Sequence, residues 1–112
     1  MNFITNKHIS KDYVSEYIME KSGIAFAMLT YYKNEKHIMV LSNVNISESF
    51  QKKGHGNELL ESVILHARTL GCEYLYLNTI DSKSWITAWY KRRGFVPYRE
   101  DENGECYMFI KL

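Results

Sequence analysis

Apolar residues recur along the chain at two spacings, which separate strand-like segments from helix-like ones. Ile24 to Tyr32 and His37 to Ile46 are rich in β-branched and aromatic residues, and the polar residues Lys33 to Lys36 join them. This pattern predicts two strands of a hairpin. From Asn57 to Leu70 the apolar residues instead recur every three or four positions, which predicts an amphipathic helix.

The second half of the chain continues with shorter elements. Cys72 to Ile80 is apolar at successive positions, which predicts a central strand in a sheet that is covered on both sides. Trp85 to Arg93 is predicted to form a short helix. Val96 to Arg99 and Glu105 to Leu112 are predicted strands, and Asn103-Gly104 between them is typical of a hairpin turn.

The first twenty or so residues have a less regular pattern. Asn2 to Thr5 is predicted to be a short edge strand. The apolar side chains that follow fall on one helical face at Tyr13, Val14, Tyr17 and Ile18. Ser10 carries the hydroxyl that an N-cap needs, and Gly23 suits a C-terminal stop. We therefore expect a helix from Ser10 to Gly23.

The expected order of elements is strand, helix, two strands, helix, strand, helix, two strands. This order predicts an α+β fold in which helices pack on a mixed sheet. A chain of 112 residues is long enough for one core and shorter than chains that split, so residues 1–112 are expected to form a single domain. The composition, 46% hydrophobic and 24% charged, is that of a globular protein.

Charge and hydropathy exclude several classes of partner. The formal net charge of +1 gives no overall field that would draw the chain to nucleic acid or to a membrane surface. The longest apolar run, which begins at Ile24, is far shorter than the about 20 residues of a membrane helix. The N-terminus lacks the apolar segment of a secretory signal. We expect a cytoplasmic protein without nucleic-acid or membrane partners.

The cysteines and histidines form no recognisable reactive motif. Cys72 and Cys106 have neither metal-ligand spacing nor the density of a disulfide scaffold, so both are interpreted as buried thiols in strands. A cysteine nucleophile would need a nearby imidazole, and the sequence places no histidine beside either thiol. His66, at the edge of the apolar helical stripe, is interpreted as a boundary residue. No metal is expected.

The connection between the strand that ends at Ile46 and the helix that begins at Asn57 is the most informative segment. It begins at Gln51 and contains Lys52, Lys53, Gly54 and Gly56. Glycines let the backbone approach an anion, and the first turn of the helix adds unpaired N–H groups and a partial positive charge. The segment therefore predicts a phosphate-binding loop, although its spacing fits neither a Rossmann nor a Walker motif.

The order Gln-x-x-Gly-x-Gly after a strand resembles the pyrophosphate-binding loop of the GCN5-related N-acetyltransferase (GNAT) superfamily, which binds acetyl-coenzyme A. Ala88 to Phe95, a short helix that carries a tyrosine and ends in Gly-Phe, resembles the second signature of that superfamily. The resemblance covers roughly Ile24 to Leu112. It implies a GNAT-like fold, a central mixed and mostly antiparallel β-sheet flanked by about three helices, which is abbreviated at its N-terminus.

The resemblance also implies which residues bind acetyl-CoA, the expected co-substrate. A strand would pair with the pantetheine arm, and the loop with the first helical residues would hold the pyrophosphate. The positions concerned are Val44, Asn45, Ile46, Gln51, Lys52, Lys53, Gly54, His55, Gly56 and Asn57. An asparagine often contacts coenzyme A just before the tyrosine helix in the family, and Lys83 stands at its place here, between Ser82 and Ser84.

Tyr90 matches the family tyrosine that protonates the departing thiolate, so it is the implied catalytic acid. The alternative is a core aromatic, because Trp85, Ile86 and Trp89 form an apolar stripe and Tyr90 lies at its border. The cations from Lys91 to Arg93 fit the negative end of a helix.

The general base is left open by the sequence. Histone-type members carry a glutamate on the strand before the loop, and by offset this position is Val40. Asn43, Glu48, Glu73 and Asp81 are the candidate substitutes. The resemblance therefore implies transfer of an acetyl group to a primary amine by a chain that lacks the usual strand glutamate.

The acceptor and partners are predicted only by class. The family elements missing near the start usually help to wall the acceptor pocket, so an open groove and a protein or peptide acceptor are expected. The acidic hairpin from Glu100 to Glu105 would either attract a cationic amine or serve as a solvated turn. A monomer or homodimer is expected.

Two other functions stay open. A degenerate relative could bind coenzyme A without turnover or act as a protein-interaction module. A sheet with exposed aromatics, here Tyr74 and Tyr76, is also a known form of RNA-binding surface, although the sequence shows no basic sheet to support it.

Overall fold

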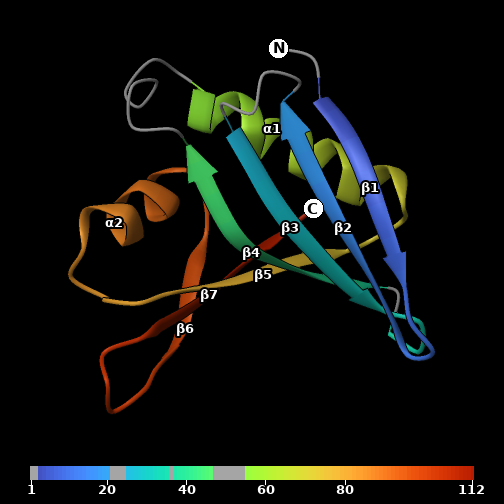
Figure 1. Ribbon diagram of the computed structural model, residues 1–112. Coiled ribbons are helices and arrows are strands. Elements are labelled where there is room, and N and C mark those ends of the chain that lie inside the picture. Colours follow the sequence, from blue (N-terminus) through green and yellow to red (C-terminus); the bar gives the residue numbers. More distant parts are fainter. Residues whose placement is uncertain (1–2, 21–24, 36, 47–54) are drawn as a thin grey trace.

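The computed structural model describes residues 3–20, 25–35, 37–46 and 55–112 (Figure 1). Within these residues seven strands form one sheet in the order β1-β2-β3-β4-β5-β7-β6, with two helices. The elements are β1 (Phe3–Ile9), β2 (Tyr13–Glu20), β3 (Ala25–Tyr32), β4 (Ile38–Ile46), α1 (His55–Thr69), β5 (Tyr74–Thr79), α2 (Trp85–Arg92), β6 (Val96–Glu100) and β7 (Cys106–Lys111).

The sheet is mixed and mostly antiparallel, as predicted. Among the described strands only β4 and β5 pair in parallel, and the other neighbouring strands run antiparallel. The predicted hairpins β3–β4 and β6–β7 and the helices α1 and α2 lie within about two residues of their expected bounds. β5 lies inside the sheet between β4 and β7, which confirms its prediction as a central strand.

The core lies between the sheet and α1. Alternate strand residues point to opposite faces, and one set faces the helices. The fully or nearly fully buried members of this core include Ala27, Leu29, Met39, Leu41, Leu59, Leu60, Val63, Ala67, Leu75, Leu77 and Met108. α1 contributes to it at the predicted helical spacing, so its apolar stripe is what fixes the helix against β3 and β4.

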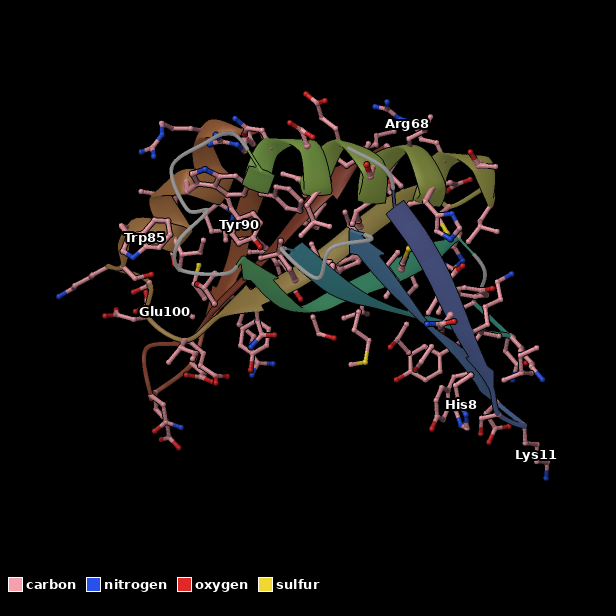
Figure 2. All side chains as sticks on the ribbon, turned by 45° about the horizontal axis from the view of Figure 1, so that its top comes forward. His8, Lys11, Arg68, Trp85, Tyr90 and Glu100 are labelled. Carbon is pink, nitrogen blue, oxygen red and sulfur yellow. The ribbon has the colours of Figure 1, made fainter. Side chains whose placement is uncertain are left out.

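The opposite face of the sheet carries no helix in the described part of the chain (Figure 2). Both helices pack on the face of Leu75, whereas Tyr74 and Tyr76 point to the other face, where Phe109 of β7 contacts both rings. Our expectation of a sheet covered on both sides was therefore wrong for these residues. Tyrosine tolerates this position because its ring is apolar while its hydroxyl remains hydrated.

The predicted helix from Ser10 to Gly23 was also wrong. Tyr13–Glu20 forms β2, which pairs with β1 on one side and with β3 on the other. The apolar positions fit both periods, and pairing with the neighbouring strand decided between them. Alternation puts Val14 and Glu16 in the core while Tyr13 faces solvent.

The N-terminal part of the fold thus consists of two strands, with no helix in residues 3–20. β1 is an edge strand, as predicted, but runs to Ile9. Two strands precede β3 and are joined by a short turn, in which the Ser10 N–H donates to the Tyr13 carbonyl at 2.9 Å. About three helices were predicted, and the described residues contain two.

A buried polar pair ties β2 to α1. Glu16 is 1% exposed, and its Oε2 lies 2.6 Å from Nε2 of His66. His66 is thus more than the boundary residue that the sequence suggested, because it provides a polar partner for a carboxylate inside the core. The misassigned secondary structure of β2 hid this pair.

Both cysteines are buried and are not joined in a disulfide, as predicted. Burial raises the pKa of the Cys72 thiol, which disfavours its reactive thiolate. The described helices are all too short or too polar to cross a membrane, and a cytoplasmic location stays a prediction of the sequence.

Replacing His66 with alanine should lower the free energy of unfolding by about 2 to 3 kcal/mol, because it removes the partner of the buried Glu16 carboxylate. Urea denaturation measures this change. Arg68→Ala, on the exposed surface of the same helix, is the matched control and should change stability by no more than about 0.5 kcal/mol. Equal effects of the two substitutions would contradict a stabilising role for the pair.

Candidate functional site

β4 and β5 pair over three residues and then separate. The pairs are Ile38 with Tyr74, Met39 with Leu75 and Val40 with Tyr76. β4 nevertheless continues to Ile46 and β5 to Thr79. Beyond Val40 the two strands therefore diverge and form a fork. The backbone of β4 that borders this fork is not paired with β5.

A β-bulge in β4 lies at this fork. Phe26 pairs with Asn45 and Met28 with Ser42, so two residue steps on β3 match three on β4. A bulge leaves one residue outside the ladder and increases the local bend and twist. It provides a physical reason for the separation of β4 from β5. The predicted pantetheine-pairing residues Val44, Asn45 and Ile46 lie on this bulged part of β4.

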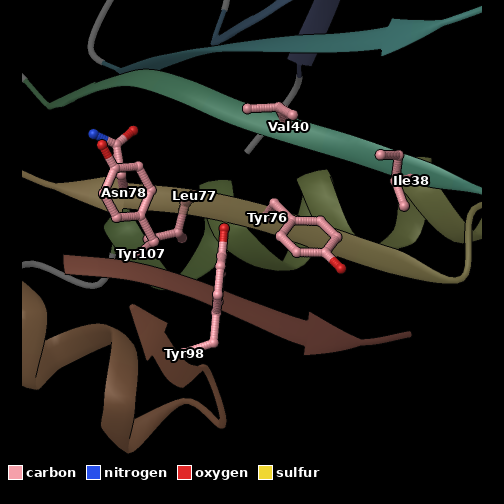
Figure 3. Close-up of a pocket in the computed structure, with 7 residues that line it drawn as sticks. All are labelled: Ile38, Val40, Tyr76, Leu77, Asn78, Tyr98 and Tyr107. Atoms are coloured by element: carbon pink, nitrogen blue, oxygen red, sulfur yellow. The ribbon is translucent and has the colours of Figure 1, made fainter. Parts of the chain in front are cut away.

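A cavity of about 330 Å³ lies at the closed end of the fork, on the face without helices (Figure 3). It is lined by Ile38, Val40, Tyr76, Leu77, Asn78, Tyr98 and Tyr107. Val40, which stands at the place of the family glutamate, belongs to this lining. None of the seven residues has a carboxylate or an imidazole side chain.

The first turn of α1 is held against α2. A Cβ added at Gly56 would lie 3.3 Å from Cζ2 of Trp89, so the glycine allows this close approach. The Arg93 guanidinium lies 3.7 Å from the centroid of the Trp89 ring, and its Nε donates to the Asn57 side chain at 2.6 Å. Arg93 thus brings a positive charge to the helix end that already favours anions.

Several predicted cofactor residues lie outside what the structure describes. Gln51, Lys52, Lys53 and Gly54 belong to the undescribed segment 47–54, and only the backbone of His55 is described. Of the predicted loop, Gly56 and Asn57 are therefore the residues whose packing and contacts are known. The phosphate-binding role of all these residues stays a prediction.

The turn from β5 into α2 is fixed by a short chain of hydroxyl groups. The Thr79 and Thr87 hydroxyls lie 2.6 Å apart, and Thr87 Oγ1 donates to the Asp81 carbonyl at 2.7 Å. Ser84 caps the helix by accepting from the Thr87 N–H. Thr79 and Thr87 are buried, so these bonds set the position of α2 on the sheet.

Tyr90 lies in the core on the helix side of the sheet (Figure 2). The expected border position was wrong, because Trp85 of the predicted apolar stripe is 71% exposed whereas Tyr90 is buried. Gly94 adopts a φ of 99°, which turns the chain so that the Phe95 ring packs 5.4 Å from the Tyr90 ring. Trp89 contacts Tyr90 edge to face at 5.1 Å. Burial raises the pKa of Tyr90 to about 12. The Tyr90 hydroxyl is therefore a proton donor that stays protonated at neutral pH.

Lys83 and its neighbours occupy the exposed turn before α2. The backbone N–H of Lys83 donates to Asp81 Oδ1 at 2.9 Å, and the Lys83 side chain is exposed. Ser82 Oγ donates to Glu100 at 2.7 Å, and Ser84 caps α2. Both serines next to Lys83 thus already have partners within the protein.

Two of the candidate bases, Glu73 and Asp81, lie at opposite ends of β5. Glu73 directly precedes β5 at the end where β4 and β5 pair, and its carbonyl accepts from the Leu112 N–H. Asp81 follows β5 at the open end of the fork. The side chains of Asn43 and Glu48 lie outside the described residues. The geometry thus separates Asp81 from Glu73, which the sequence did not.

The described residues contain no cluster of His, Cys, Asp or Glu side chains arranged to hold a metal ion. The sequence profile of the Acetyltransferase (GNAT) family matches residues 4–95. The chain belongs to this family. Comparison with curated proteins finds no match.

Solved structures share the GNAT fold at low sequence identity. An IAA acetyltransferase from Bacillus cereus is 17% identical, with 99% of this chain and 100% of that chain covered and a TM-score of 0.73. A GNAT family acetyltransferase from Elizabethkingia anophelis with acetyl-CoA bound is 19% identical, with 99% of each chain covered and a TM-score of 0.69. The ribosomal-protein-S18-alanine N-acetyltransferase from Escherichia coli is 21% identical, with 92% and 71% covered and a TM-score of 0.69.

Sequence reasoning missed three residues of this candidate site. The sequence indicates only that Arg93 lies at a charged helix end, and its contact with Asn57 depends on how α2 packs against α1. Tyr98 and Tyr107 lie on strands that follow the tyrosine helix and carry no motif. Tyr107 stands between the apolar Cys106 and Met108, so the pattern shows neither that Tyr107 shares a face with Tyr98 nor that this face meets the fork.

Replacing Thr87 with valine should lower the free energy of unfolding by about 1 to 3 kcal/mol, because the buried Thr79 hydroxyl loses its partner. Thermal or urea unfolding measures this loss. Thr69→Val is a matched control, because the Thr69 hydroxyl is exposed and bonds only the helix backbone at Leu65. A loss no larger than that of the control would show that the hydroxyl chain does not hold α2.

Proposed function

We propose that this GNAT protein transfers the acetyl group of acetyl-CoA to a primary amine of a protein or peptide. The observation that carries the proposal is the fork between β4 and β5. α1 begins near the open end of the fork, and an aromatic cavity lies at its closed end (Figures 1 and 3). Such an arrangement can receive two reactants from opposite sides of one sheet.

The bulged part of β4 suits the acyl donor. When bound, acetyl-CoA supplies the activated acyl group as a thioester. Backbone N–H groups of β4 that β5 does not pair are available to hold the extended arm and to stabilise negative charge on the carbonyl oxygen. The first turn of α1, with Gly56 and Arg93, is suited to the phosphate groups.

Tyr90 is the proposed acid. A leaving thiolate needs a proton, and a phenol in a desolvated site remains protonated and ready to donate it. The pKa of about 12 is consistent with a donor rather than a base at neutral pH. Thr87, one turn earlier on α2, would position Tyr90 through the bonds that fix the helix to β5.

The acceptor would approach from the face without helices. An open face accommodates an acceptor of any size, which supports a protein or peptide. The solved neighbours do not decide this point, because the acceptors in their names differ. The cavity offers no carboxylate to remove the ammonium proton, so Asp81, three residues beyond Asn78 of the cavity lining, is the proposed base.

Gly54→Glu should abolish binding of acetyl-CoA, because a carboxylate in the predicted phosphate loop repels the pyrophosphate and fills the space beside the backbone. Isothermal titration of the wild-type protein and the variant measures the dissociation constants. Arg93→Gln, which removes one charge beside α1, should weaken binding by about 3- to 10-fold.

Leu65→Glu is the control for this titration, because it adds the same charge to the exposed side of α1 away from its first turn. Its dissociation constant should equal that of the wild type. A folded wild-type protein that binds no acetyl-CoA would overturn the proposed function. Binding without turnover on any amine would indicate the non-catalytic alternative.

Tyr90→Phe should reduce turnover about 10²-fold or more while the affinity for acetyl-CoA stays within about twofold, as expected for loss of a general acid. Steady-state kinetics and titration separate these effects. Unchanged turnover in the variant would exclude the acid role.

The burial of Tyr90 also predicts a pH dependence of stability. The pKa of about 12 in the folded protein lies above the ordinary value of 10. The stability gained from the neutral phenol is therefore complete below pH 10 and is lost as the pH rises towards 12.

A further inference from the structure

Three tyrosines from three strands surround the cavity on the face without helices (Figure 3). Tyr76 of β5 and Tyr98 of β6 meet edge to face, with ring centroids 5.8 Å apart and an angle of 88°. Tyr98 and Tyr107 of β7 are 6.4 Å apart at 55°. Differently oriented rings around one space present electron-rich faces to a cation.

A second bulge directs Tyr98 into this group. Pro97 pairs with Met108 and Arg99 with Tyr107, so Tyr98 is the extra residue on β6. Bulges change the direction of one side chain and recur beside functional sites. Although Tyr98 is 52% exposed, its ring contacts those of Tyr76 and Tyr107. The β6 backbone thus departs from regular pairing at the residue that borders the cavity.

Carboxylates surround the hydroxyl end of Tyr107. Its phenol donates to Glu105 Oε2 at 3.0 Å and lies 3.3 Å from Asp101 Oδ2. The pKa of Tyr107 is raised, first by the hydrogen bond with Glu105, then by desolvation and by the negative charges of Glu105 and Asp101. The rim of the cavity at this tyrosine is therefore negative.

Arg99 shows that this aromatic group accommodates a cation. Its guanidinium carbon lies 4.4 Å from the centroid of the Tyr107 ring. Arg99 adds one positive charge, whereas the hairpin carries the four carboxylates of Glu100, Asp101, Glu102 and Glu105. The local balance of charge remains negative and favours a second cation.

We propose that the cavity binds a cationic side chain of a peptide acceptor, a lysine or arginine next to the amine that is acetylated. This inference rests on the proposed function. The reacting amine must be neutral and lie at the fork, whereas the rings of Tyr98 and Tyr107 and the hairpin carboxylates hold a charge. A volume of about 330 Å³ is at the small end for ligand pockets, which suits one side chain. The acceptor is thus a basic segment with two neighbouring cations.

Single-stranded RNA is the competing occupant, because bases also stack on exposed tyrosines. The charges distinguish the two. Phosphate groups would meet the carboxylates of Asp101 and Glu105 at the edge of the cavity, and RNA affinity depends on cations that track the backbone. The charge around the tyrosines favours the basic peptide.

An NMR titration with two blocked tetrapeptide amides tests the inference. One has two adjacent lysines, and in the other norleucine replaces the second lysine. The wild-type protein, saturated with coenzyme A, should bind the first peptide about 3- to 30-fold more tightly, the range expected for a cation over aromatic rings. Tyr98→Leu should reduce this ratio to about one, whereas Tyr98→Phe keeps the ring and should preserve it.

Charge variants provide a second measurement. Glu105→Gln should lower the preference for the dilysine peptide, with a larger effect at low salt. Glu61→Gln removes the same charge from the exposed surface of α1, on the other side of the sheet, and should leave the preference unchanged. Circular dichroism and titration with acetyl-CoA establish that each variant is folded and competent to bind the cofactor.

The outcomes separate the inference from the proposed function. If acetyl-CoA binds but the two peptides bind equally well, or Tyr98→Leu keeps the preference, the assignment of the cavity is wrong and the acetyltransferase proposal stands. Binding of an oligouridylate that Tyr98→Leu abolishes would replace the peptide with RNA. Absence of acetyl-CoA binding in the folded wild type would instead remove the proposed function itself.

Discussion

The separation of β4 from β5 after three paired residues is the constraint on which the site depends. Each strand is held on its outer side, β4 by β3 and β5 by β7, so the two sides of the sheet can diverge without losing those ladders. The extra residue in β4 bends that strand at the divergence. The fork is therefore a property of the whole sheet, because β4 and β5 stay paired with β3 and β7 where they separate from each other.

The two faces of the sheet have different roles. The helix side contains the closely packed core, and α2 is positioned there by the buried hydroxyls of Thr79 and Thr87. Tyr90 belongs to this side, so the proposed proton donor lies among rigid neighbours. The other side holds rings that pack against one another rather than beneath a helix. One face can thus support the cofactor while the opposite face remains open to an acceptor.

The N-terminal strands show how the sheet supports an abbreviated fold. β1 extends the sheet as predicted, β2 extends it where a helix was expected, and β2 contributes Glu16 to the core. A buried carboxylate is costly unless it is paired, and His66 on α1 provides that partner. The pair joins the N-terminal hairpin to the helix that leads from the predicted phosphate loop. Stability at this end of the sheet is therefore connected to the position of α1.

The sequence by itself determined the family, the β3–β4 and β6–β7 hairpins and the helices α1 and α2, because these features depend on local periodicity and on glycines at fixed spacing. Only the tertiary structure decided the rest. Residues 13–20 fit a helix and a strand equally well until β3 supplied a partner for pairing. The fork, the two bulges and the meeting of Tyr76, Tyr98 and Tyr107 depend on register between segments far apart in the chain. A one-dimensional pattern does not contain that register, since pairing energies are set by neighbours across the sheet.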